Sequence, residues 1–330
     1  MPSVKTYSNL FDTIVTLDNL SAAYRAARRG KRGKPQAALF EIEAERNLLR
    51  LHGELREGAY RPGRYRLLLI REPKRRVIAA APFRDRVVHH AWCRVVMPLL
   101  FRSFIDDTYA CLPGRGTHRA VLRHLEFMRK YEYRCHLDVR AFFPSVTVDL
   151  LLDLIAQRIQ DRRAVDLLSR ILESGLGIYR EERVMSYLGL EPYGPEERRG
   201  LPIGNLTSQH LANCYLSELD HLIKREWKTR GYLRYMDDLV LFGDHPGQLR
   251  DRAEQAIDYL DRQRKLEVKQ RPRVIPTRAP ATYLGYVASR SGLRLSASML
   301  TKIRCRARRL ASTESPRLQR TLSSWKGVPW

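Results

Sequence analysis

Two adjacent aspartates, Asp237 and Asp238, lie within a largely apolar stretch at residues 231–243. Apolar runs on both sides of a short polar tip are the pattern of a β-hairpin, so both carboxylates are expected at its turn. A third aspartate, Asp138, follows strand-like residues 133–137. Hard divalent cations prefer carboxylate oxygens and substrate phosphates. Three aspartates on adjacent strands could hold two such ions, one to activate an attacking hydroxyl and one to stabilise a leaving pyrophosphate. An Asp-Asp pair alone is more often a solvated turn, so this interpretation depends on the rest of the sequence.

The elements that would position these carboxylates follow from hydrophobic periodicity. Residues 1–35 are predicted to hold a helix followed by a basic, glycine-containing loop that could contact phosphate, and residues 176–200 are predicted to be a polar excursion. Further helices are predicted at 36–57, 87–104, 148–175, 207–230, 248–265 and 298–312. Short β-like runs predict strands at 66–70, 76–80, 133–139, 268–275 and 282–287, besides the hairpin at 231–243.

The charge of the chain points to a polyanionic partner. The 330 residues include 60 Lys and Arg against 36 Asp and Glu, which gives a formal net charge of +24 and a pI near 10.3. Such an excess is most often used to bind nucleic acid. A basic surface of the ribosomal or thermophilic type is the alternative. Hydrophobic residues make up 44% of the chain, which argues against disorder over most of its length.

The cysteines and the start of the chain indicate a cytoplasmic protein. The five cysteines have no metal-site spacing and are odd in number, so we expect reduced, structural thiols. No signal-peptide pattern opens the sequence, and its longest charge-free run, 200–217, contains too many polar residues for a membrane span.

The sequence around the two aspartates resembles a known family. The active-site signature of reverse transcriptases is similar to the four residues Tyr235, Met236, Asp237 and Asp238. Residues 137–145 (LDVRAFFPS) resemble the motif that carries the first catalytic aspartate of that family. The nucleotide-pocket motif is similar to residues 200–209 (GLPIGNLTSQ), and the primer-grip turn is similar to Tyr283, Leu284 and Gly285. The motifs occur in the family's order, and the resemblance covers roughly residues 60–310.

The resemblance implies an α+β fold of the right-hand polymerase type, with fingers, a palm built on an antiparallel sheet, and a small helical thumb. It divides the chain into an N-terminal extension at 1–35, fingers at 36–130, palm at 131–147, a fingers/palm insertion at 148–200, palm at 201–290 and thumb at 291–330. It also implies RNA-directed DNA synthesis from dNTPs, with two Mg²⁺ ions, or Mn²⁺ in their place, held by Asp138, Val139, Asp237 and Asp238.

Other roles come from the same resemblance. Phe143 would pack under the sugar and reject a 2′-hydroxyl, while the basic turn with Lys74 and Arg76 would meet the triphosphate. The remaining expected nucleotide contacts are Ile203, Gly204, Gln209, Tyr235 and Met236. The basic thumb helix would lie on the RNA/cDNA duplex through Lys302, Arg306 and Arg309. A lysine proposed to protonate pyrophosphate could be at Lys269, but Arg271 competes for the position, and the sequence does not choose between them.

The subfamily is indicated by two positions of the nucleotide-pocket motif. Most reverse transcriptases have Gln and Pro where this chain has Ile203 and Gln209. With these two residues, the pocket motif resembles that of the reverse transcriptases of diversity-generating retroelements in bacteria, archaea and phages. The same resemblance holds for residues 81–90, 109–111 and 116–118. That family copies a template RNA with frequent errors at adenines and binds a small basic ring-forming accessory protein. The alternatives are another bacterial reverse transcriptase, of retron, group II intron-like or phage-defence type, and a catalytically silent RNA-binding scaffold.

Overall fold

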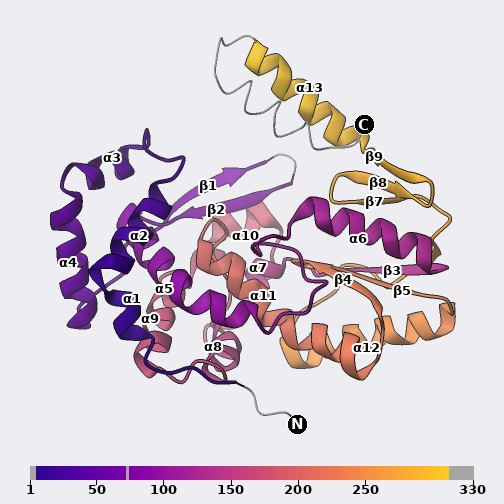
Figure 1. Ribbon diagram of the computed structural model, residues 1–330, viewed down its shortest axis with the longest axis horizontal. Coiled ribbons are helices and arrows are strands. Elements are labelled where there is room, and N and C mark those ends of the chain that lie inside the picture. Colours follow the sequence, from indigo (N-terminus) through magenta and orange to yellow (C-terminus); the bar gives the residue numbers. More distant parts are fainter. Residues whose placement is uncertain (1–4, 72–73, 312–330) are drawn as a thin grey trace. The chain divides into compact units, whose positions relative to one another are not determined.

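The computed structural model describes residues 5–71 and 74–311 (Figure 1). The chain folds into two compact units, each assembled from separated stretches of sequence. Unit 1 contains residues 1–106, 138–226 and 255–270, and unit 2 contains residues 107–137, 227–254 and 271–330. The predicted catalytic residues are divided between them, because Asp138 belongs to unit 1 while Asp237 and Asp238 belong to unit 2.

Unit 1 is mainly helical. Its helices are α1 (Phe11–Val15), α2 (Leu17–Arg28), α3 (Pro35–Ile42), α4 (Ala44–Arg56), α5 (Phe83–Phe101), α7 (Phe142–Ser145), α8 (Val148–Ala156), α9 (Arg162–Glu173), α10 (Glu182–Leu188) and α11 (Leu206–His221). An antiparallel hairpin joins β1 (Arg66–Ile70) to β2 (Arg76–Ala80). Helix starts follow capping rules, since Asp161 accepts from the backbone N–H of Ala164 at 3.1 Å and the Thr16 hydroxyl accepts from that of Asn19.

The core of unit 1 forms around α5. Trp92 is fully buried and donates its indole N–H to the backbone oxygen of Ala164 at 2.9 Å, which ties α5 to α9. Leu20 of α2 and Leu51 of α4 are also fully buried. Burying these side chains removes apolar surface from water, which stabilises the helical layer.

Unit 2 contains two antiparallel sheets. The larger has the strand order β4-β5-β3-β6, made of β4 (Gly231–Tyr235), β5 (Asp238–Gly243), β3 (Tyr133–Asp138) and β6 (Val274–Pro276). The smaller has the order β7-β8-β9, made of β7 (Ala281–Tyr283), β8 (Tyr286–Ser289) and β9 (Gly292–Leu295). Figure 1 shows α6 (Thr117–Lys130) between the two sheets. Phe127 of α6 is buried in one core with Phe242 of β5 and Tyr283 of β7. Helix α13 (Ala297–Ala311) follows β9, and α12 (Pro246–Arg264) contributes residues to both units.

Most predicted elements are confirmed, including both strands of the first hairpin and the hairpin at 231–243. The predicted strand at 268–275 is largely wrong: only residues 274–276 form β6, and Val268 makes an isolated bridge to Val139. Pro272 has no N–H for a sheet ladder, which accounts for the break. The predicted strand at 282–287 is two strands around a turn, the polar excursion contains α10, and α11 continues past His221 only as a π-helical turn, Leu222–Glu226.

Of the helices in the described part of the chain, none is long and apolar enough to cross a membrane. All five cysteines are free thiols. Burial raises the pKa of the Cys135 thiol to about 12, so this buried thiol behaves as a packing residue rather than a nucleophile.

Two buried histidines lie outside any hydrogen-bond network of the described residues. His89 on α5 and His124 on α6 are almost fully buried, and neither ring nitrogen of either side chain has a partner among the residues described. Burial lowers the pKa of both to about 3. Smaller contributions come from His90 and Arg86 for His89, and from His136 and Arg134 for His124.

We therefore expect the protein to lose stability in mild acid. Below about pH 6.5 the unfolded chain binds a proton at each histidine while the folded chain does not, so the free energy of unfolding falls as the pH falls. Each histidine should remove about 2 kcal/mol between pH 8 and pH 5. Urea unfolding at pH 8, 6 and 5 measures this. Between pH 8 and pH 5 the free energy of unfolding of the His89→Leu variant should fall by less than that of the wild type. An equal fall in the variant would contradict the assignment of His89 as a histidine buried in its neutral form.

Candidate active site

The two-aspartate hairpin has a tight turn. Tyr235 pairs with Asp238, so Met236 and Asp237 form a two-residue loop between β4 and β5. Met236 has a φ of 58°, a left-handed conformation that a non-glycine residue rarely adopts. Two-residue loops that match the twist of a hairpin require such values. The sequence thus places a strained residue directly before Asp237, which is half-buried at the tip.

Arg234 supports this turn from inside the protein. Its side chain is fully buried and donates from Nη1 to the backbone oxygen of Met236 at 3.0 Å. Its backbone N–H donates to the oxygen of Asp107, and its backbone oxygen accepts from Tyr109. A buried guanidinium needs such acceptors, because an unpaired one would be strongly unfavourable. Sequence reasoning missed Arg234, although a single charged residue inside an apolar strand was the available signal.

Asp238 lies near a histidine on the adjacent strand. Nδ1 of His136 on β3 is 3.8 Å from Oδ1 of Asp238, the first residue of β5. Burial, and next the Arg134 charge, lower the pKa of His136 to about 4, so the imidazole near this carboxylate is neutral at pH 7. His124 stacks on Tyr283 with ring centroids 4.5 Å apart, and His136 meets the same tyrosine edge-on. Sequence reasoning did not connect His136 with the site.

Asp138 is the last residue of β3 and forms an ion pair with Lys269. Nζ of Lys269 is 2.7 Å from one carboxylate oxygen of Asp138 and 2.6 Å from the other. The backbone N–H of Lys269 also donates to the oxygen of Asp138 at 2.9 Å, next to the bridge between Val139 and Val268. Of the two candidates left open by the sequence, the structure brings Lys269 to the aspartate. Arg271 belongs to the other unit.

The residues predicted for the nucleotide are partly brought together within unit 1. The backbone N–H of Leu201 donates to the oxygen of Phe143, and that of Ala79 on β2 donates to the oxygen of Ile203, both at 2.8 Å. Gly204 has a φ of 118°, and a Cβ there would lie only 3.0 Å from the backbone oxygen of Ala79. The motif at 200–204 therefore links the segment of Phe143 to β2.

The two adjacent phenylalanines differ in burial. Phe142 is 2% exposed and belongs to the core, whereas Phe143 is half-buried. Both residues lie in the short helix α7, and of the two only Phe143 keeps a partly exposed ring, as a contact with the sugar would require.

Other predicted nucleotide contacts are on the surface. Lys74 and Arg76 are exposed at the start of β2, and Gln209 is exposed in the first turn of α11. In unit 2, the hydroxyl of Tyr235 is 3.1 Å from that of Thr117. That these side chains contact a nucleotide stays a prediction.

The predicted primer-grip residues form a second two-residue turn. Leu284 and Gly285 connect β7 to β8 and have φ values of 48° and 88°. Positive values at both positions are the geometry of a type I′ hairpin loop. The backbone N–H of Ser296 donates to the oxygen of Gly285 at 3.0 Å. On α13, Lys302 and Arg306 are exposed. The third residue predicted to contact the duplex is Arg309, and its side chain lies outside the described part of the chain.

The chemistry of the predicted metal ligands fits a hard divalent cation, since carboxylate oxygens are what Mg²⁺ prefers. Val139 is fully buried, and because its side chain has no ligand atom it could offer only its backbone oxygen. Within residues 5–71 and 74–311, no three His, Cys, Asp or Glu side chains are grouped closely enough to hold a metal ion. Both oxygens of Asp138 accept hydrogen bonds from Lys269, so this ammonium group would compete with a metal ion for the carboxylate. The metal set stays a prediction.

Comparison with known families gives one match over most of the chain. The family described as "Reverse transcriptase (RNA-dependent DNA polymerase)" matches residues 71–288. This range includes the Asp138 segment, the pocket motif, the two-aspartate hairpin and the Tyr283–Gly285 turn.

Distant relatives agree with that match. The chain is 22% identical over 226 residues to the group II intron-encoded protein LtrA of Lactococcus lactis subsp. cremoris, covering 66% of this chain and 36% of that one. It is 26% identical over 179 residues to an uncharacterized 91 kDa protein in a cob intron of Schizosaccharomyces pombe, with coverage of 53% and 21%. Protein YkfC of Escherichia coli is 26% identical over 187 residues, with coverage of 54% and 45%. The chain therefore spans less than half the length of these relatives.

Proposed function

This chain belongs to the reverse transcriptase (RNA-dependent DNA polymerase) family, and we propose that it copies a template RNA into cDNA from dNTPs. The observation that carries the proposal is the match over residues 71–288. Within that range, Asp237 lies in the strained two-residue loop of an antiparallel hairpin. A fold alone does not imply an activity, but here the residue types and their local geometry agree with the family.

The reaction would depend on three carboxylates. Asp138, Asp237 and Asp238 would hold two Mg²⁺ ions, or Mn²⁺ in their place, which supply charge stabilisation for the attacking hydroxyl and the leaving pyrophosphate. Lys269 would be released from Asp138 and would donate a proton to the leaving pyrophosphate, because a lysine ammonium group can act as a general acid. An arginine could not take this role, since it does not lose its proton near neutrality.

The remaining roles and the wider organisation are also proposals. Phe143 would exclude a ribose 2′-hydroxyl, and Tyr283–Gly285 would hold the primer end. The chain would be organised as fingers, palm and thumb, with the predicted boundaries, and would act in the cytoplasm. Primer extension by this protein alone, on poly(rA)/oligo(dT) with Mg²⁺, tests the polymerase activity. Absence of extension, with RNA binding retained, would favour the catalytically silent scaffold.

We further propose that the enzyme belongs to the diversity-generating type, makes frequent errors at template adenines for mutagenic retrohoming, and works with a small basic ring-forming accessory protein. Ile203 and Gln209 of the pocket motif support this. A group II intron-like enzyme is the second candidate, because a relative found over 66% of the chain is a group II intron-encoded protein. A repeat of the template near the gene would favour the first candidate.

Ile203→Gln tests the error-prone proposal. The backbone of Ile203 is fixed to β2 through its carbonyl, so the substitution changes mainly the half-buried side chain. Isoleucine can orient a nucleotide only by packing, whereas glutamine can also hydrogen-bond. Misplacement by about 1 Å can cost about a hundredfold in rate, so added positioning should favour the correct pair. We expect fewer misincorporations opposite template adenine than in the wild type, and little change opposite the other bases. Sequencing of cDNA made by both enzymes on one template measures this.

The matched control is Ile203→Val, which stays apolar and should keep the wild-type error spectrum. A uniform loss of activity with an unchanged spectrum in Ile203→Gln would make Ile203 a packing residue. A wild-type enzyme that is accurate at adenine would contradict the diversity-generating assignment and leave the polymerase assignment intact.

A further inference from the structure

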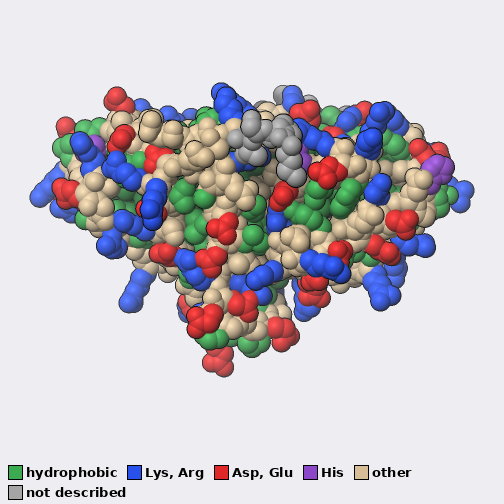
Figure 2. Space-filling model, turned by 90° about the horizontal axis from the view of Figure 1, so that it is seen from below, with side chains coloured by type: hydrophobic (Ala, Val, Ile, Leu, Met, Phe, Trp, Pro, Cys, Tyr) green, Lys and Arg blue, Asp and Glu red, His purple; other side chains and the backbone are tan. Residues whose placement is uncertain are grey.

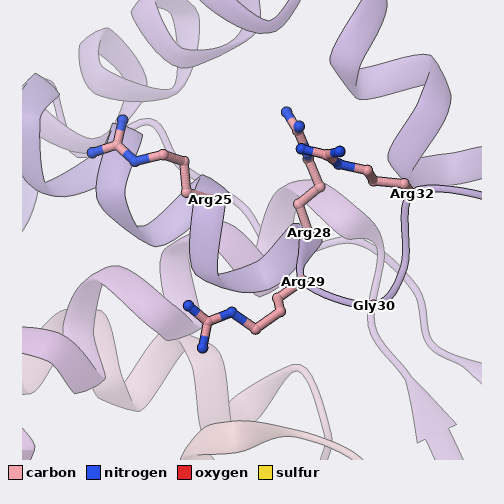
Figure 3. A pocket seen from close by; sticks show the side chains of 5 residues that line it. All are labelled: Arg25, Arg28, Arg29, Gly30 and Arg32. Atoms are coloured by element: carbon pink, nitrogen blue, oxygen red, sulfur yellow. The ribbon is translucent and has the colours of Figure 1, made fainter. Parts of the chain in front are cut away.

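The turn between α2 and α3 concentrates positive charge. Residues 25–34 read RAARRGKRGK, with six cations and no acid. The structure has a pocket of about 450 Å³ there, lined by Arg25, Arg28, Arg29, Gly30 and Arg32. Figure 3 shows Arg25 and Arg28 on α2, Arg29 directly after the helix with its side chain pointing away from Arg28, and Arg32 in the turn that follows. We call these four side chains the α2 arginines. None is among the residues predicted for catalysis or nucleotide binding.

Little negative charge balances the α2 arginines. Arg28 pairs with Glu41 at 2.9 Å and donates to the hydroxyl of Tyr24. For Arg25, Arg29 and Arg32, no carboxylate of a described residue lies within ion-pair distance. On the molecular face drawn in Figure 2, by contrast, basic side chains are interspersed with acidic ones. A pocket lined by like charges attracts anions and repels cations.

Lys31 and the cations of α5 extend the same positive field, whereas His90 between them is neutral at pH 7. Lys31, in the turn, is half-buried, and burial followed by the charge of Arg86 lowers its pKa. His90 is one helical turn beyond Arg86 on α5, and burial, then Lys31, His210, Arg94 and Arg86, lower its pKa to about 4. Residues four apart share one face of a helix, so α5 presents Arg86, His90 and Arg94 on one side. All of these residues belong to unit 1.

The spacing of the first two α2 arginines suits a repeated anion. Arg25 and Arg28 are three residues apart on α2, where such positions lie about 5–6 Å from each other, and a nucleic-acid strand carries one phosphate per nucleotide. Guanidinium groups bind phosphate oxygens through two parallel hydrogen bonds, which ammonium groups cannot do. We propose that the α2 arginines bind the phosphate backbone of the template RNA. This rests on the proposed function, which supplies RNA as the substrate, and the contact would carry no sequence preference.

The test replaces Arg25, Arg29 and Arg32 together with glutamine and leaves Arg28, which pairs with Glu41. Glutamine preserves helix propensity and approximate length. The matched control replaces three exposed arginines of α4, Arg46, Arg50 and Arg56, with glutamine, which removes the same charge from the same unit. Binding of the full chain to a labelled unstructured 30-nucleotide RNA is followed by anisotropy between 0.1 and 1 M NaCl.

We expect the α2 triple variant to flatten the slope of log affinity against log salt by about 2, because each phosphate contact on a single strand contributes about 0.7. If the affinities converge at 1 M salt, the loss at 0.1 M is about 100-fold. The α4 control should keep the wild-type slope. Replacing the same three arginines with lysine should keep the slope but lower the affinity, because an ammonium group cannot make the two parallel hydrogen bonds that a guanidinium makes to phosphate.

Three outcomes would overturn the proposal. An α2 triple variant with the wild-type slope excludes the contact, and equal losses in both triple variants mean that only net charge matters. If inorganic tripolyphosphate binds the wild type but not the α2 triple variant, while RNA affinity is equal in both, the pocket takes a free polyphosphate instead. Primer extension by the wild type separates these failures from failure of the proposed function, which would remove extension whether or not RNA binding is retained.

Discussion

Asp237→Asn should reduce polymerisation by about a thousandfold or more, because a metal-stabilised transition state loses several kcal/mol when a charged ligand is removed, and each 1.4 kcal/mol is tenfold in rate. The change keeps the shape of the side chain. The turn should persist, since Arg234 donates to the backbone carbonyl of Met236, which the substitution leaves unchanged. RNA binding should stay within about twofold, because it depends on basic residues.

The measurement is single-turnover primer extension, with RNA affinity determined on the same preparations. Asp251→Asn is the matched control, because Asp251 is an exposed aspartate on α12 in the same unit. It should leave extension unchanged. Retained activity in Asp237→Asn would remove the two-metal assignment, and loss of RNA binding in parallel would mean that the variant is misfolded.

Local features of this protein could be predicted from its sequence. The hairpin at residues 231–243 is predictable because apolar runs that flank a short polar tip are properties of adjacent residues. The strands at 66–70 and 76–80 were recognised for the same reason. The element α6 was not singled out, although its position between the two sheets shapes the core of unit 2.

Contacts between distant segments could not be predicted in this way. His136 lies 3.8 Å from Asp238 of the two-aspartate hairpin, but this contact depends on which strands become neighbours. The choice between Lys269 and Arg271 shows the limit clearly. Residues two apart point to the same face of an extended segment, so periodicity cannot separate them. The decision comes from the pairing of Val139 with Val268, which sets Lys269 against Asp138.

Because that pairing places Lys269 beside Asp138, substitution of Lys269 is the second change from which we expect a large loss of polymerisation rate. Its ion pair with Asp138 is about half exposed, at 40% and 48% for the two side chains, so it should contribute at most about 1 kcal/mol to stability. Lys269→Met should therefore leave the melting temperature nearly unchanged. If Lys269 protonates the leaving pyrophosphate, the same change should lower the rate of the chemical step by about 10²- to 10⁴-fold, which is the usual range for general acid catalysis.

Lys269→Arg separates proton donation from charge. Arginine can keep the ion pair with Asp138 but does not release a proton near neutrality. We expect this variant to bind RNA and dNTP as the wild type does, and to lose rate as Lys269→Met does. Arg271→Gln is the control, because Arg271 is an exposed cation two residues away, and it should keep the wild-type rate. If Lys269→Arg retains the wild-type rate while Lys269→Met does not, Lys269 acts only as a positive charge that positions Asp138. The proton on pyrophosphate must then come from water or another side chain.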